Sequence, residues 1–128
     1  MVIIKKEPNI DLGKKILSFL DTTYVKPTVF FWFYLKESNS WRLMLSSRAY
    51  KNINLHEAYT KFISEFGNNL DVLIVGLPNI TILNENDKLI GLFRLAFKTE
   101  PGSLSSIRLQ SCMVHGVYVE DVFIYRLR

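Results

Sequence analysis

The run Val-Phe-Phe-Trp-Phe-Tyr-Leu at residues 29–35 constrains the fold more than any other part of the chain. It is too short for a typical helix and far shorter than the roughly 20 residues that cross a bilayer. Because the run is apolar without interruption, it predicts a central strand with both faces covered. A base-stacking strand would alternate its aromatic residues with polar or basic ones, so the run favours a core role over nucleic-acid contact.

Three further segments are predicted to be strands near this one. Residues 41–45 alternate after a polar turn and predict the second strand of a hairpin. Residues 72–75 are continuously apolar and predict a short strand that is buried on both faces. Residues 80–83 predict an edge strand, where the nearby Pro78 is tolerated.

Residues 107–114 and 117–127 flank His115-Gly116 and predict a terminal hairpin with a two-residue turn. The register that follows pairs Val114 with Val117, Cys112 with Val119 and Gln110 with Asp121. One face is mainly apolar and is expected to meet the core: Ile107, Leu109, Met113, Tyr118, Val122 and Ile124. The other face is mixed, and we expect it to be partly exposed or covered by a partner: Arg108, Gln110, Cys112, Asp121, Phe123 and Tyr125. Asp121 is expected to pair diagonally with Arg108 across the hairpin.

Residues 11–20, 55–66 and 87–97 have the apolar spacing of helices. Each follows a side chain that can cap a helix: Asn9 or Asp11, Asn54, and Asn84 or Asn86. The buried face predicted for the second helix comprises Leu55, Ala58, Tyr59, Phe62, Ile63 and Phe66. The third helix is expected to bury Leu89, Ile90, Phe93, Ala96 and Phe97 and to end before Pro101 and Gly102. The order α-β-β-α-β-α-β-β predicts a single α+β domain over residues 1–128, with a mixed or antiparallel sheet and helices mainly on one face.

Cys112 is the only cysteine among 128 residues. A lone cysteine excludes an internal disulfide and is typical of a reducing compartment. The start of the chain lacks the long apolar stretch and the cleavage site of a signal peptide. We therefore expect a soluble, cytoplasmic protein without a membrane partner.

Sequence motifs that mark a catalytic mechanism are absent. There is no phosphate-binding glycine loop, no dinucleotide fingerprint and no nucleophile elbow. The two histidines, His56 and His115, are too few for a three-histidine zinc site. We predict no metal, no cofactor and no catalytic residue, and the sequence leans away from an enzyme. An active site assembled from scattered residues is the remaining enzymatic alternative, with the candidates Glu57, Asp71, Asp87, Arg94 and Asp121.

The absence of catalytic motifs favours a small protein-interaction module that binds a partner protein or self-associates as a homo-oligomer. Its predicted interface lies on the mixed face of the terminal hairpin, at Arg108, Gln110, Asp121, Phe123 and Tyr125. The alternative is binding to nucleic acid or to an acidic partner, because residues 1–64 carry ten Lys/Arg against five Asp/Glu. The cations expected in that role are Lys14, Lys15, Arg42, Arg48 and Lys51.

Overall fold

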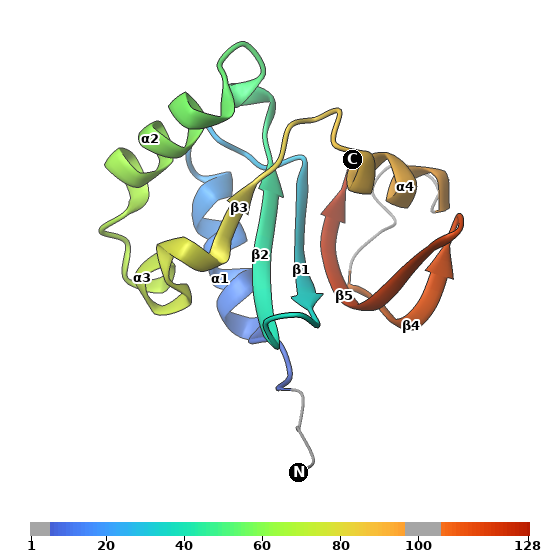
Figure 1. The fold of residues 1–128 in the computed structure, drawn as a ribbon. Helices are drawn as coiled ribbons and strands as arrows, with labels where there is room; N and C mark the ends of the chain where they lie inside the picture. Colours follow the sequence, from blue (N-terminus) through green and yellow to red (C-terminus); the bar gives the residue numbers. More distant parts are fainter. Residues whose placement is uncertain (1–5, 97–105) are drawn as a thin grey trace.

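The structure is a computed structural model that describes residues 6–96 and 106–128. Over these residues it contains four α-helices, two short 3-10 helices and five strands (Figure 1). In chain order the elements are α1 (Ile10–Asp21), β1 (Val29–Leu35), β2 (Ser40–Ser46), η1 (Arg48–Tyr50), α2 (Leu55–Phe66), α3 (Leu70–Val75), η2 (Leu77–Asn79), β3 (Ile80–Ile82), α4 (Lys88–Ala96), β4 (Ile107–Val114) and β5 (Val117–Leu127). The predicted α+β class is confirmed, and α3 is the one element whose type was predicted wrongly.

The five strands form one mixed sheet in the order β3-β2-β1-β5-β4. β1 pairs antiparallel with β2 on one side and with β5 on the other, and β4 pairs antiparallel with β5. β3 is an edge strand, as predicted, and runs parallel to β2. The aromatic run therefore lies at the centre of the sheet.

The side chains of β1 are buried on both faces because they alternate between two cores. Phe30 and Trp32 belong to the core beneath α1, α2 and α3, whereas Val29 and Phe31 pack with residues of α4. In Figure 1, α2 and α3 lie beside β3, and α4 lies beside the hairpin of β4 and β5. Three helices thus cover one face of the sheet and one helix covers the other, which confirms helices mainly on one face.

Residues 70–75 form the helix α3, so the buried strand predicted for residues 72–75 was wrong. The side-chain oxygen of Asn69 accepts a hydrogen bond from the Val72 amide at 3.1 Å and caps the helix. Gly76 ends it with a φ of 89°, a backbone conformation that favours glycine. Within α3, Val72 alone is buried, so the apolar run faces the core on one side only.

The predicted caps Asn9 and Asn54 are confirmed. The side-chain oxygen of each accepts a hydrogen bond from the amide three residues later, at 3.1 and 2.8 Å. At the start of α4, the Leu89 amide instead donates a hydrogen bond to the side-chain oxygen of Asp87 at 2.9 Å. Three residues predicted near the end of this helix lie outside the described residues: Phe97, Pro101 and Gly102.

The buried face of α2 is narrower than predicted. Its buried residues are Ala58, Phe62 and Phe66. Leu55 and Ile63, which were predicted to share that face, are exposed at its margins. Tyr59 is partly buried, and its hydroxyl accepts a hydrogen bond from the Ile82 amide at 2.9 Å.

The terminal hairpin has the predicted register, but its predicted faces hold for only part of its length. Ser111 has a φ of 46°, a left-handed conformation that interrupts the alternation of side chains. Residues on both sides of Ser111 therefore point to the α4 core: Ile107, Leu109, Cys112 and Val114. Met113 and Tyr118, which were predicted to be buried, are exposed near the turn, and Val119 is buried in their place.

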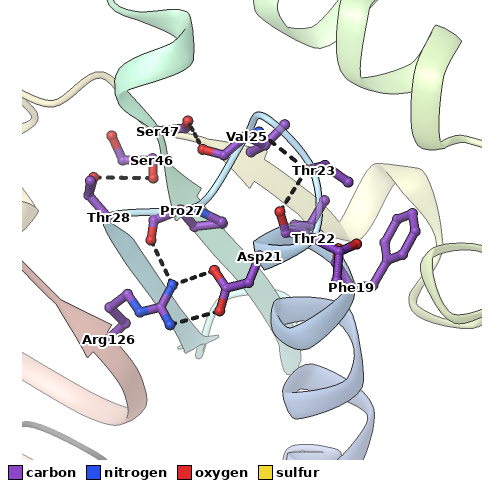
Figure 2. Close-up of polar contacts among 11 residues, drawn as sticks. Phe19, Asp21, Thr22, Thr23, Val25, Pro27, Thr28, Ser46, Ser47 and Arg126 are labelled. Carbon is purple, nitrogen blue, oxygen red and sulfur yellow. Dashed lines mark hydrogen bonds and ion pairs between the residues drawn. The ribbon is translucent and has the colours of Figure 1, made fainter.

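A polar clasp holds the loop after α1 against the sheet (Figure 2). The guanidinium of Arg126 on β5 donates to both carboxylate oxygens of Asp21, at 2.7 and 2.8 Å. It also donates to the Pro27 carbonyl at 3.0 Å. The Ser47 hydroxyl, beyond the end of β2, donates to the Val25 carbonyl. These contacts fix the end of α1 over β1 and β5.

Candidate functional site

The cations predicted to bind nucleic acid or an acidic partner are divided between separate surfaces. Lys14 and Lys15 lie on the exposed face of α1. They line a surface hollow of about 540 Å³ together with Asp11, Ser18 and Asp71, and we call this the lysine hollow. Asp71 belongs to α3, so the lysine hollow joins the outer surfaces of α1 and α3.

The other three predicted cations lie outside the lysine hollow. Arg42 on β2 donates to the Pro78 carbonyl at 2.9 Å, which places it beside η2 and close to the end of α3. Arg48 lies beyond the end of β2, where its side chain is 3.8 Å from Glu85. Lys51 lines a second hollow of about 380 Å³ in the same region. The structure therefore does not bring the five cations together.

The predicted interface residues of the terminal hairpin make contacts within the chain. Asp121 is fully buried, and Arg108 donates to its two carboxylate oxygens at 3.0 and 2.7 Å, which confirms the predicted pair. Gln110 donates to Asp121 at 3.3 Å. Arg108 also donates to Glu7 at 2.5 Å. Hydrogen bonds to Asp121 first, and to Glu7 second, raise the pKa of the Arg108 guanidinium.

The remaining two predicted interface residues pack beneath α1. Phe123 is buried, and its ring contacts that of Tyr125. The Tyr125 hydroxyl donates to the Ile10 carbonyl at 2.6 Å and accepts from Trp32 Nε1 at 3.0 Å. Burial, which outweighs the Trp32 hydrogen bond and is reinforced by the charge of Asp11, raises the pKa of Tyr125 to about 12. These two aromatic side chains therefore attach α1 to β5.

Besides the lysine hollow, another hollow lies next to α3, and its lining is mainly apolar. It has a volume of about 480 Å³, and we call it the tryptophan groove because Trp32 and Trp41 line it with Ile74 and Val75. Residues 6–9 form another wall. Trp41 Nε1 donates to the Lys6 carbonyl at 2.6 Å, so the segment is held where it runs past the groove.

The outer face of α3 is an exposed apolar stripe formed by Leu70, Leu73 and Ile74. Their side chains are 72%, 52% and 61% exposed, respectively. The spacing i, i+3, i+4 puts all three on one side of the helix. Ile74 also lines the tryptophan groove, so the α3 stripe and the groove form one continuous apolar surface.

Sequence reasoning missed the α3 stripe because residues 72–75 were interpreted as a strand. Two local signals could have indicated the helix. Asn69 stands directly before the apolar residues as a helix cap, and Gly76 stands directly after them as a stop. Leucine or isoleucine at positions 70, 73, 74 and 77 also fits helical spacing better than strand alternation.

The scattered acidic and basic residues considered for an active site stay apart. Glu57 and Asp71 lie on α2 and α3, whereas Asp87 and Arg94 belong to the α4 side of the sheet. In the described part of the chain, no group of three or more His, Cys, Asp or Glu side chains is placed to hold a metal ion.

Two tyrosines of the described chain, Tyr24 and Tyr50, also have side chains with a raised pKa. Burial is the largest cause that raises the pKa of each tyrosine, and Glu65 raises both further. The hydroxyls therefore stay protonated at neutral pH, which is the opposite of what an activated nucleophile requires.

Every helix in the described ranges, 6–96 and 106–128, is too short or too polar to span a bilayer. Comparison of the chain with protein-family models, with characterised proteins and with solved structures found no match. No family role therefore carries over to the α3 stripe or to the tryptophan groove.

Proposed function

We propose that the chain is a protein-interaction module that binds a partner protein through the α3 stripe and the tryptophan groove. The observation that carries this proposal is the exposure of Leu70, Leu73 and Ile74 side by side on one helix. Single exposed apolar side chains are ordinary on a protein surface, but a contiguous patch beside an apolar groove is typical of an interaction site.

The size of the patch sets the strength of binding that it can support. All three side chains are more than half exposed, so covering them completely contributes roughly 3–5 kcal/mol. A micromolar complex requires about 8 kcal/mol. The α3 stripe alone is therefore too small, and contacts inside the tryptophan groove must supply the rest.

The mixed face of the terminal hairpin offers less free apolar surface than the α3 stripe. Phe123 and Asp121 are buried within the chain, and Arg108 contacts Glu7 as well as Asp121. This internal use of the mixed face favours α3 over that face as the surface that meets a partner.

The test compares two leucine variants that remove the same chemistry from opposite sides of the sheet. Leu73→Ser removes an apolar contact from the α3 stripe. Leu95→Ser is the matched control, because Leu95 on α4 has a similar exposure of 55%. Tagged wild type and both variants are used to capture proteins from cells that naturally contain the chain, and the captured proteins are quantified by mass spectrometry.

We expect wild type and Leu95→Ser to capture the same partner protein in equal amounts. Leu73→Ser should capture at least about tenfold less of it, since a central contact is worth at least about 1.4 kcal/mol. Purified candidate and wild type must then bind directly in calorimetry. Equal recovery by the two variants, with unchanged circular dichroism, contradicts the proposal.

A further inference from the structure

The charges around the α3 stripe are unevenly balanced. Two lysines, Lys14 and Lys15, line the lysine hollow on one side of α3. Lys6 lines the tryptophan groove, and Arg42 lies next to it through its hydrogen bond to Pro78. The apolar surface is thus bordered by four cationic side chains.

The carboxylates near the same surface do not offset these cations fully. Glu7 is paired with Arg108 at 2.5 Å. Asp11 and Asp71 each lie in the first turn of their helix, where the positive end of the helix dipole stabilises them. In the part of the chain that the structure describes, Lys14 and Lys15 take part in no ion pair. The single charge of Arg108 faces both Asp121 and Glu7, so Glu7 also counts. Four cations against three carboxylates leave a surplus of one positive charge.

We infer that the partner presents an acidic segment, with apolar side chains that cover the α3 stripe and with Asp or Glu residues that face the four cations. This inference rests on the proposed function. A second copy of the chain fits less well, because a symmetric contact through α3 would bring two identical cationic borders together. The cations steer the acidic segment and set its register, and the apolar contacts hold it.

The first experiment selects binders from a random peptide library displayed on phage, with the full chain as bait. The selected peptides are expected to be rich in Asp and Glu beside Leu, Ile or Phe. The most enriched peptide is then synthesised, and its affinity is measured by fluorescence anisotropy. Raising NaCl from about 0.05 to about 0.5 M should weaken binding roughly tenfold, since salt screens exposed charge pairs.

Paired charge reversals locate the contact. Changing Lys14→Glu and Lys15→Glu together should weaken peptide binding at least tenfold. Changing Arg48→Glu and Lys51→Glu together is the matched control, with the same change in net charge at the other end of the sheet, and should leave binding within twofold. The Leu73→Ser variant should also weaken binding at least tenfold.

The outcomes separate the two proposals. If selected peptides are not acidic, or both double reversals bind equally, the acidic partner is refuted, while loss of binding in Leu73→Ser still supports the interaction module. A selection that yields no peptide dependent on Leu73 refutes both.

Sedimentation that shows a dimer dependent on Leu73 assigns the stripe to a second copy. Salt-sensitive binding of a single-stranded oligonucleotide that needs the lysines but not Leu73 assigns them to nucleic acid. Either result refutes the acidic partner.

Discussion

Changing Arg108 to methionine should destabilise the fold far more than its place near the surface suggests. The carboxylate of Asp121 is fully buried, and the Arg108 guanidinium makes two hydrogen bonds to it. Methionine keeps a flexible apolar stem of similar shape but removes the positive charge. The variant would therefore hold a buried carboxylate that has lost its bidentate arginine.

Removing one partner of a buried ion pair typically costs about 3–5 kcal/mol. The Arg108 side chain is 25% exposed, so water can reach the vacated position and the cost should fall near 3 kcal/mol. For a domain of this size, that loss lowers the Tm by about 10 °C. Changing Asp121 to asparagine should cost less, roughly 1–2 kcal/mol, because the guanidinium left behind is partly solvated.

The double variant gives the sharpest comparison. Arg108→Met combined with Asp121→Asn contains no buried charge, so it should be more stable than Arg108→Met alone by at least about 1 kcal/mol. Glu7→Gln serves as a control, because it removes the second partner of Arg108 without touching Asp121.

Urea unfolding followed by the fluorescence of Trp32 and Trp41 measures all of these differences through the midpoint at a constant m value. Two results would refute the reasoning. One is a loss of less than about 1 kcal/mol in Arg108→Met, which falls below any cost expected for a broken buried pair. The other is a double variant that is no more stable than Arg108→Met.

Four further variants test particular contacts. Gly13→Ala should lower the free energy of unfolding by about 1–3 kcal/mol, measured by thermal unfolding, because a Cβ there lies 2.2 Å from the Tyr125 hydroxyl and 2.7 Å from Trp32 Nε1. Gly91→Ala is the control: a Cβ there meets nothing within 4 Å, so the variant should be more stable by up to about 1 kcal/mol. The pKa of Tyr125 is raised from 10.0 to about 12, so its hydroxyl ionises in the unfolded chain before it does in the folded one, and the free energy of unfolding falls as pH rises from about 10 to 12. In urea titrations over this range, Tyr125→Phe should show a shallower fall than wild type. Asn69→Ala removes the cap of α3 and should cost about 1 kcal/mol by urea unfolding and weaken partner binding in calorimetry, an expectation contradicted if both stay unchanged.

The parts of the fold that were predicted correctly have strong local causes. The aromatic run at β1 has no polar side, so it could only lie between two layers. Asn54 and Glu57 mark the start of α2 by their own hydrogen bonds. The pairing of Arg108 with Asp121 follows from a two-residue turn, which fixes the register of β4 and β5.

The parts that failed depend on structure that a local pattern does not contain. The β-branched residues near position 72 favour a strand when considered in isolation. The cap at Asn69 and the burial of Val72 alone stabilise a helix instead. The faces of the terminal hairpin depend on the backbone of Ser111, a residue that ordinarily avoids a positive φ. The strand order was likewise left open, because it is set by contacts between distant segments.

These same errors explain why the proposed site has moved from the terminal hairpin to α3 and why the binding mutations are placed there. Interpreted as a strand, residues 72–75 would have been core and their substitution would unfold the chain. In α3, Leu73 is half exposed, so Leu73→Ser should change the stability by only about 0.5–1 kcal/mol. A variant that folds normally and fails to bind separates a contact with a partner from a contact with the core. The hairpin residues cannot provide that separation, because Asp121 and Phe123 are buried within the chain.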